Sequence, residues 1–334
     1  MRAAALSTRG SAALVLLVAL AVHARTVAFG FTGLDDRDVL VGDRVFLADP
    51  ANLLRVFGRS YLYVVDPSHA YWRPLVSASY LLDAQWSGVN PWGYHATNVV
   101  LHAVASVLVL ALLRRFALGR RVALAAALVF AVHPALASAV AWIPGRNDTL
   151  LTVMALASWL LLLKRHWGAH LVFFALALMT KETALALPVL WGVTLLGRRH
   201  RRDPRGWLLA GWAALVAARF VVHPGAPHAT PGELASNLPL LAVALGKLVL
   251  PVRPTVLAVA GDLPVWPGVA AAVGIALATW RLPRARRPVI ALGALAFVLF
   301  LAPALAVPGT LVLDHRLVLP FVGVLIVLGE IVRA

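Results

Sequence analysis

The chain has 334 residues, of which 61% are hydrophobic and 13% charged, and its mean hydropathy is +0.85. Soluble domains are typically about 45–50% apolar and about 25% charged, so the composition excludes an ordinary soluble protein and indicates an integral membrane protein. The absence of cysteine excludes disulfides, thiolate chemistry and cysteine-ligated metals. The formal charge of +16 is interpreted as a topology signal and not as a nucleic-acid-binding surface.

The first apolar run covers residues 11–29 and follows Arg2 and Arg9. A charged start and small residues are also typical of a signal peptide, but the length of the run and the spans that follow favour an uncleaved first transmembrane helix. Residues 30–94 contain no spanning run, and about twenty apolar residues are needed to cross a bilayer as a helix. Further spans are expected near residues 96–113, 122–140, 148–163, 168–180, 183–197, 207–222, 266–280, 288–306 and 317–333.

The basic residues predict the orientation of these spans. Half of the thirty Lys and Arg residues lie in four short loops, residues 114–121, 164–165, 198–205 and 281–287. By the positive-inside rule these loops face the cytoplasm, which places loop 30–94 on the outer side. That loop carries half of the fourteen acids, namely Asp35, Asp36, Asp38, Asp43, Asp49, Asp66 and Asp83.

One apolar run, residues 237–252, conflicts with this topology if it crosses the membrane, because loop 281–287 would then move outside. Its prolines Pro239, Pro251 and Pro254 favour a re-entrant or interfacial segment with irregular backbone. The predicted fold class is therefore an all-α polytopic membrane protein with about ten transmembrane helices and a large first outer loop. Both ends are expected in the cytoplasm, and residues 1–334 are expected to form a single transmembrane domain.

Several ionisable residues lie at the outer ends of the expected spans, where charge is costly and a functional role is the default interpretation. His95, Asn98 and His102 share one face of a helix at spacings of three and four residues. They suit either helix packing or a site. His133, before Pro134, suits either a helix end or a site.

Five further residues also allow two interpretations. Arg146 and Asp148 suit an interfacial ion pair, which would contribute little stability. The adjacent Lys181 and Glu182 suit a neutralised pair. Arg73, beside Trp72, suits a membrane anchor whose charged head reaches the interface.

Taken together, these residues describe an outward cavity with paired carboxylates, Asp35 and Asp36, and several cations. A carboxylate can take the proton of an acceptor hydroxyl. Arg and Lys can hold a phosphate leaving group, and a long apolar tail on that phosphate would lie among the spans. The cations are Arg73, Arg146, Lys181 and Arg316.

The order of the motifs resembles the GT-C superfamily of membrane glycosyltransferases. It is most similar to the O-mannosyltransferase-like membrane region of the transmembrane and tetratricopeptide-repeat proteins. The specific part lies in residues 69–102 and 130–183. The matching segments are "LDDRDVLVGD", "YWRPLVSASYLLDAQWSGVNPWGYHATNVVLH", "FAVHPALASAVAWIPGRNDTLLTV", "MTKETALALP", "GKLVLPVRPTV" and "DHRLVLPFVGVLIV".

This resemblance implies that a polyprenyl- or dolichyl-phosphate sugar donates its sugar, with inversion, to an acceptor hydroxyl on a protein or glycan at the outer face. Asp35 or Asp36 would be the catalytic base, and coupled carboxylates do not reveal which of the two acts. The residues implied in binding the donor phosphate or substrate are Tyr71, Trp72, Arg73, His95, His102, His133, Arg146, Asp148, Lys181, Glu182 and Arg316. Membrane lipids are the other expected partners, and a bacterial inner membrane with a periplasmic site is the expected location.

The sequence departs from the family pattern in three places. Ser138 stands where the family usually has Glu, which leaves the use of a divalent metal open. The segment "HRLVLP" lacks the tyrosines of the family's "RYLYLP", and the 334 residues contain no tetratricopeptide repeats.

Three other functions remain open. A transporter or lipid flippase would require ionisable groups near mid-membrane and internal repeats, whereas the polar residues here lie at the outer ends. A non-catalytic scaffold derived from such an enzyme fits Ser138. An oligosaccharide ligase or polymerase of the cell envelope would share the lipid-phosphate chemistry, but it usually lacks the early pair of aspartates.

Overall fold

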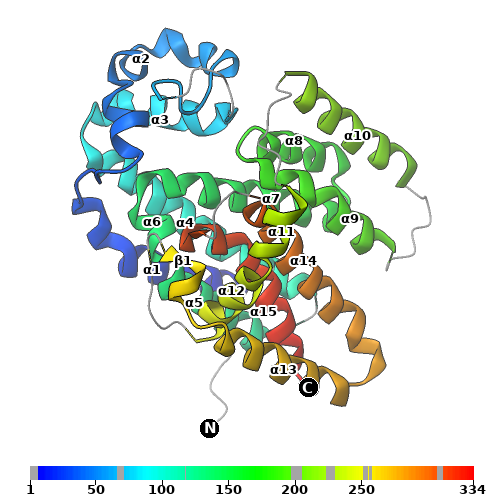
Figure 1. The fold of residues 1–334 in the computed structure, drawn as a ribbon. Helices are drawn as coiled ribbons and strands as arrows, with labels where there is room; N and C mark the ends of the chain where they lie inside the picture. The colour runs from blue at the N-terminus through cyan, green and yellow to red at the C-terminus, as the bar shows by residue number, and fades with distance from the viewer. Residues whose placement is uncertain are drawn as a thin grey trace. The chain divides into compact units, whose positions relative to one another are not determined.

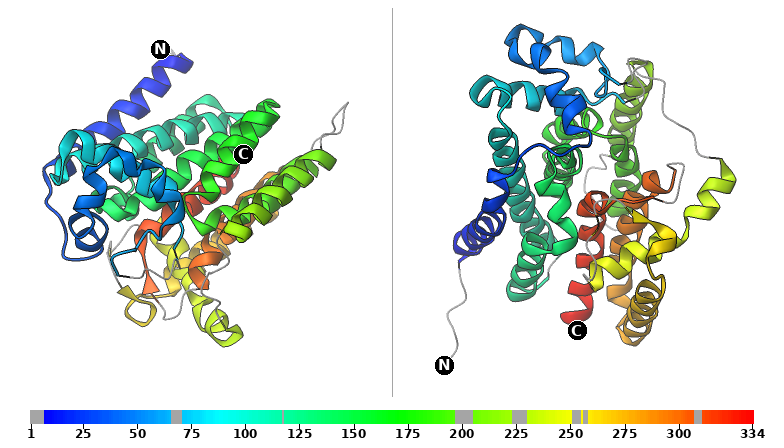
Figure 2. Two further views of the ribbon diagram at one scale, coloured as in Figure 1. Left: turned by 90° about the horizontal axis from the view of Figure 1, so that it is seen from above. Right: turned by 60° about the vertical axis from the view of Figure 1, so that its left-hand side comes forward.

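The computed structural model describes residues 7–65, 71–116, 118–196, 205–222, 230–250, 255, 258–306 and 311–334. Helices form nearly all of the regular structure, as Figures 1 and 2 show. Three residues named in the sequence analysis lie outside the described residues: Asp66, Pro251 and Pro254. The predicted all-α polytopic fold class is confirmed.

The elements up to residue 164 are α1 (Thr8–His23), η1 (Ala24–Ala28), η2 (Arg37–Val41), α2 (Arg44–Ala48), η3 (Pro50–Leu53), η4 (Arg55–Gly58), α3 (Pro74–Ser87), α4 (Pro91–Arg115), α5 (Arg120–Val132), η5 (Pro134–Leu136), α6 (Ala137–Ala141), η6 (Ile143–Gly145) and α7 (Arg146–Lys164).

The later elements are α8 (Trp167–Leu178), η7 (Glu182–Ala186), α9 (Leu187–Leu196), α10 (Arg205–Val222), α11 (Pro231–Asn237), α12 (Pro239–Val249), β1 (Ala258–Val259), η8 (Ala260–Asp262), α13 (Trp266–Arg281), η9 (Arg284–Arg286), α14 (Arg287–Leu305), β2 (Leu311–Val312), η10 (Asp314–Leu317) and α15 (Val318–Val332).

Within the described residues, seven helical stretches are long and apolar enough to cross a membrane, and an eighth is counted if a bent pair is one span. The seven are Thr8–Ala28, Pro91–Arg115, Ile143–Lys164, Arg205–Val222, Pro231–Val249, Arg284–Leu305 and Asp314–Val332. The bent pair is Arg120–Val132 with Pro134–Ala141, which meet at 49°. Two other expected spans form shorter apolar helices, Trp167–Leu178 and Glu182–Leu196.

Two sequence expectations about the spans need correction. The segment at 237–252 was expected to have irregular backbone, but Pro231–Val249 is helical and is one of the seven stretches. Pro239 lies in the first turn of α12, where a missing N–H costs nothing. The span expected at 266–280 forms α13, whose 16 residues are fewer than the roughly 20 that a full crossing needs.

Contacts between residues divide the chain into two compact units. The first unit contains residues 1–22, 102–138 and 229–334. In it, α14 packs along α15 and α12 along α13 (Figure 1). The short strands pair antiparallel, with Ala258 opposite Val312. This packing holds the η10 segment, which carries Arg316, at the start of α15.

The second unit contains residues 23–101 and 139–228, and thus the large first outer loop. Although it lacks a span, much of this loop folds into η2, α2, η3, η4 and α3 around an apolar cluster that includes Leu40, Val76 and Tyr80. Pro74 and Pro91 begin α3 and α4, and Gly88 ends α3 with a φ of 59°, which favours glycine. The loop is therefore a packed platform beside α7.

The crossing of α14 and α15 depends on two glycines. A Cβ added at Gly293 would lie 2.8 Å from the carbonyl oxygen of Gly323, which is closer than real contacts allow. We expect Gly323→Leu to destabilise the protein by about 1–3 kcal/mol, because small residues let helices approach closely and overpacking is costly. The measurement is the midpoint of thermal unfolding in detergent.

The matched control is Gly274→Ala in α13, where an added Cβ meets nothing within 4 Å. This change should leave the midpoint unchanged or raise it, since Ala is favoured over Gly inside a helix by about 0.5–1 kcal/mol. Equal destabilisation by both variants would show that the crossing does not depend on close backbone approach.

Candidate functional site

Asp35 and Asp36 lie in the second unit, immediately before the η2 turn. Asp36 is fully buried, and its Oδ2 accepts hydrogen bonds from the Thr32 backbone N (2.7 Å) and Oγ1 (3.0 Å). Its Oδ1 is also buried and has no hydrogen-bond partner among the described residues. Asp35 is half-buried. Asp36 therefore combines one fixed oxygen with one buried oxygen that is not engaged.

Both carboxyl groups are harder to ionise than an ordinary aspartate. Burial raises the pKa of Asp35, and the nearby charge of Asp38 raises it further. Burial also raises the pKa of Asp36, which the hydrogen bonds from Thr32 lower in part and the charge of Asp35 raises again. A carboxylate with a raised pKa is a stronger proton acceptor once it is ionised, which suits a general base.

A second group of charges surrounds Glu182 at the start of η7. The Nη2 atom of Arg73 lies 2.9 Å from Glu182 Oε2, and Arg219 Nη2 lies 4.0 Å from Oε1. Arg73 also lies over the rings of Tyr61 and Tyr71, with distances of 5.4 and 5.1 Å to their centroids. Two guanidinium groups thus share one carboxylate, and the positive charge of Arg73 lowers the pKa of Asp35.

The aromatic side chain of Trp72 supports the same group. Its Nε1 donates to the Phe57 carbonyl oxygen at 2.7 Å, and the Arg219 guanidinium lies 4.9 Å from its ring centroid. Arg73 and Trp72 therefore belong to one packed assembly and are not free interfacial anchors, as one interpretation of the sequence had suggested.

Lys181 pairs with Asp148 in the first turn of α7. Its Nζ donates to both carboxylate oxygens, at 2.6 and 2.7 Å. The sequence had suggested that Lys181 neutralises its neighbour Glu182, and that Arg146 pairs with Asp148. Both pairings are wrong, because the turn at 180–182 directs the two side chains to different partners: Lys181 binds Asp148, and Glu182 binds Arg73.

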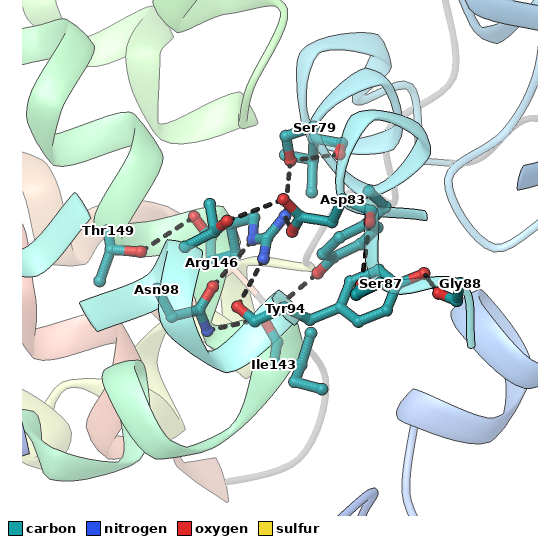
Figure 3. Close-up of polar contacts among 12 residues, drawn as sticks. Ser79, Asp83, Ser87, Gly88, Tyr94, Asn98, Ile143, Arg146 and Thr149 are labelled. Atoms are coloured by element: carbon teal, nitrogen blue, oxygen red, sulfur yellow. Dashed lines mark hydrogen bonds and ion pairs between the residues drawn. The ribbon is translucent and has the colours of Figure 1, made fainter. Parts of the chain in front are cut away.

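The guanidinium of Arg146 is fully enclosed, with 0% of the residue exposed (Figure 3). Its Nη1 atom lies 2.6 Å from Asp83 Oδ2 and donates to Ser79 Oγ at 3.1 Å. Its Nε donates to Asn98 Oδ1 at 2.8 Å, and its Nη2 to the Tyr94 carbonyl oxygen at 2.7 Å. All three nitrogens therefore bind protein oxygens from α3 and α4.

The neighbouring residues complete this network. Thr97 donates to the other oxygen of Asp83 at 2.7 Å. Asn98 Nδ2 donates to the carbonyl oxygens of Trp142 and Ile143, each at 3.2 Å, which fixes the turn before α7. Gly145 in that turn is required by space, since an added Cβ would lie 2.7 Å from the Ala139 carbonyl oxygen. As arranged here, Arg146 holds the platform together and does not face a ligand.

The three predicted histidines are all buried and contact the backbone or other rings. His95 Nε2 lies 3.4 Å from the Gly30 carbonyl oxygen in the second unit. In the first unit, His102 Nε2 lies 3.1 Å from the Ala131 carbonyl oxygen. His133 Nδ1 accepts from the Ala135 N at 3.3 Å and so caps a helical turn. These contacts favour the packing interpretation.

Arg316 lies in η10 of the first unit, next to a buried ion pair that the sequence did not single out. Lys247 Nζ lies 2.5 Å from Asp314 Oδ1 and donates to Thr255 Oγ1 at 2.6 Å. The Thr255 N donates to Asp314 Oδ2 at 2.8 Å. Arg316 belongs to the unit that also holds His102 and His133.

Four residues of the second unit were missed or left unassigned by sequence reasoning: Tyr61, Asp83, Asn147 and Arg219. Tyr61 receives a hydrogen bond from Asn147 Nδ2 at 3.1 Å and lies beside Arg73. Asp83 was counted only as one of the outer acids. Charged residues in membrane proteins usually pair with one another, and this expectation could have indicated Asp83 as the partner of a buried cation. Among the described residues, no three His, Asp or Glu side chains are grouped so as to hold a metal ion.

Comparison with protein families matches residues 78–223 to the dolichyl-phosphate-mannose-protein mannosyltransferases. Protein O-mannosyl-transferase Tmtc1 of Drosophila melanogaster is 38% identical over 184 residues, which cover 53% of this chain and 21% of that protein. Tmtc2 of the same organism is 32% identical over 185 residues, which cover 50% of this chain and 20% of that protein. No solved structure matches.

Residues 78–223 are thus similar to the dolichyl-phosphate-mannose-protein mannosyltransferases. The resemblance of its motifs to the membrane region of the transmembrane and tetratricopeptide-repeat proteins is thereby confirmed. The matched region contains Asp83, Arg146, Lys181 and Glu182, whereas Asp35 and Arg73 precede it. The chain spans about a fifth of the length of the two fly relatives.

The buried pair of Arg146 and Asp83 gives a direct test of the platform. We expect Arg146→Ala to cost about 3–5 kcal/mol of stability, because it leaves the Asp83 carboxylate buried without its cation. The double variant Arg146→Met/Asp83→Leu should lose less, since it removes both charges. Thermal unfolding in detergent, with the exposed Arg55→Ala as control, measures the difference. An equal loss in the single and double variants would contradict the role of the ion pair.

Proposed function

We propose that this integral membrane protein is a glycosyltransferase that moves a sugar from a polyprenyl- or dolichyl-phosphate donor to an acceptor hydroxyl, including protein Ser or Thr. One observation carries the proposal. Asp35 and the buried Asp36, both with raised pKa, belong to the same packed unit as the paired charges Arg73–Glu182 and Lys181–Asp148. The similarity to protein O-mannosyltransferases agrees with this chemistry.

In the proposed reaction, one carboxylate removes the proton of the acceptor hydroxyl as its oxygen attacks the anomeric carbon. The new carbon–oxygen bond forms on the face opposite the phosphate. The bond between the sugar and the phosphate oxygen breaks, the electron pair leaves with the lipid phosphate, and the anomeric configuration inverts. The catalytic carboxyl keeps the proton until it returns to water.

Arg73 is the cation best placed for the leaving phosphate. Its charge reaches Asp35, and Glu182, which its Nε and Nη2 atoms contact, is already shared with Arg219, so a phosphate could take the place of this carboxylate on the guanidinium fork. Lys181 supplies a second cation, which its pairing with Asp148 holds in place. Arg146 acts through position, because it fixes α3 and α4 beside the turn that begins α7.

The proposed topology follows the distribution of basic loops. The platform of residues 30–94 would lie on the outer side of the membrane, where a lipid-linked donor could present its sugar while its tail remains among the spans. The two units would act as one transmembrane domain. A divalent metal remains an open part of the proposal.

Ser138 favours one competing function, a non-catalytic scaffold. Its Oγ is buried and has no hydrogen-bond partner among the described residues, at the position where the resemblance leads us to expect Glu. A scaffold would bind lipid phosphate without transferring a sugar. A transfer assay separates the scaffold from the transferase.

The proposal predicts that Asp35→Asn or Asp36→Asn abolishes transfer by purified protein in nanodiscs supplied with polyprenyl-phosphate mannose, glucose or N-acetylglucosamine. Loss of the base is expected to reduce the rate by roughly 10²–10⁴-fold. The readout is sugar-dependent release of lipid phosphate. Arg55→Ala in the same loop is the control. Full activity in both Asn variants would refute the carboxylate base, and tight binding of donor without turnover would favour the scaffold.

These Asn variants should also remain folded. A carboxyl whose pKa is raised by folding contributes stability that is complete below its unfolded pKa and is lost as the pH rises through the folded pKa. At neutral pH the ionised, buried carboxylate of Asp36 lowers the stability of the folded protein. Asp36→Asn removes this charge and keeps an oxygen that can accept from Thr32, so the unfolding midpoint of the variant should equal or exceed that of the parent protein.

The pH dependence of kcat/KM distinguishes the two aspartates. Because the base must be ionised and its pKa is raised, the acid limb should lie above the ordinary value of 3.8. Thr32→Val removes a hydrogen bond that lowers the pKa of Asp36. The limb should therefore move to higher pH if Asp36 is the base, and it should stay in place if Asp35 is. A limb at or below pH 3.8 would contradict both assignments.

A further inference from the structure

The segment that carries the two aspartates also borders an open depression of about 470 Å³. The lining residues that the structure describes come from this one segment of the second unit: Phe31, Thr32, Gly33, Arg37, Val41, Gly42 and Arg44. Phe31 and Val41 make part of the surface apolar, whereas the two arginines are exposed. The depression can therefore hold a small apolar group together with an anionic one.

Among the described residues, the charged side chains that line the depression are the two arginines. Within the described part of the chain, neither Arg37 nor Arg44 forms an ion pair, and Arg44 has only a long contact from Nη1 to the Val41 carbonyl oxygen at 3.4 Å. The neighbouring acid Asp43 is neutralised by Arg59, whose two Nη atoms donate to its carboxylate at 2.8 and 2.9 Å. Asp35, Asp36 and Asp38 belong to the segment but do not line the depression.

The wall of the depression contacts Asp36, one of the two aspartates proposed as the base. Thr32, on its wall, donates both of its hydrogen bonds to Asp36 Oδ2. Arg37 follows Asp36 in the chain, and its carbonyl oxygen accepts from the Gly42 N at 2.6 Å, which closes the η2 turn. A ligand in the depression would therefore lie next to Asp36, one of the two carboxylates proposed for proton removal.

We propose that this depression binds the acceptor, and that Arg37 and Arg44 select acceptor peptides that carry a carboxylate near the accepting Ser or Thr. The inference rests on the proposed transferase function and names its acceptor class. Arg binds carboxylates through paired N–H donors. The donor lipid does not fit here, because its tail needs the spans and the depression is lined by none of them.

The test measures binding separately from turnover. Fluorescent Ser/Thr peptides of one length, with acidic, neutral or basic flanking residues, are titrated into the full chain in neutral-lipid nanodiscs, and transfer is then measured with the same peptides. We expect the acidic peptide to bind best. Arg37→Ala/Arg44→Ala should weaken its binding by roughly three- to tenfold, the range that two exposed ion pairs provide.

Charge reversal provides the stricter version. Arg37→Glu/Arg44→Glu should make the basic peptide the preferred one, which a merely structural role of the arginines would not do. Arg55→Ala, an exposed arginine of the same loop outside the depression, should leave the order unchanged. Added salt should reduce the preference, because exposed ion pairs are screened.

Each outcome decides the inference. Equal binding of the three peptides, or an order that charge reversal does not change, overturns it even if transfer is active. The inference is also overturned if Arg37→Ala/Arg44→Ala raises the KM for the donor and leaves the KM for the acidic peptide unchanged, because the depression would then hold the donor phosphate. Selective binding of the acidic peptide without transfer to any acceptor would support the depression as a peptide site while refuting the transferase function.

Discussion

The second unit depends on one buried ion pair. Arg146 is fully enclosed, and removing a guanidinium from water costs several kcal/mol unless its donors are satisfied. Asp83, Ser79, Asn98 and the Tyr94 carbonyl oxygen provide that satisfaction from α3 and α4. Because these partners lie far apart in the sequence, the charge is compensated only when the outer platform is docked against the start of α7. The electrostatic requirement thus specifies the packing.

Three other acids of this unit are also paired with cations. Asp43 is bound by Arg59, Asp148 by Lys181 and Glu182 by Arg73, each at less than 3 Å. Asp36 is different, since it is fully buried yet held only by a hydroxyl and a backbone amide of Thr32. An acid that is kept buried without a close cation costs stability, and such costs are characteristic of sites where a carboxyl must take up a proton.

The cations also divide into two kinds. Arg146 and Arg59 are committed to structure, whereas Arg73 shares its carboxylate with Arg219 and lies among aromatic rings. This division supports the proposed arrangement, in which donor phosphate, base and acceptor are handled by adjacent but separate parts of one platform.

The sequence by itself determined the membrane class, the helical fold and the resemblance to the mannosyltransferases, because hydropathy, basic loops and motif order are properties of local sequence. It also predicted that Arg73, Arg146, Lys181 and Arg316 surround one outward cavity. Only the tertiary structure decided their partners. Ion pairs form between side chains that folding brings within 4 Å, so adjacency of Lys181 to Glu182 or proximity of Arg146 to Asp148 carried no information about pairing. The helical form of Pro231–Val249 was likewise decided by the structure, since a proline in the first turn of a helix and one that breaks it look the same in sequence.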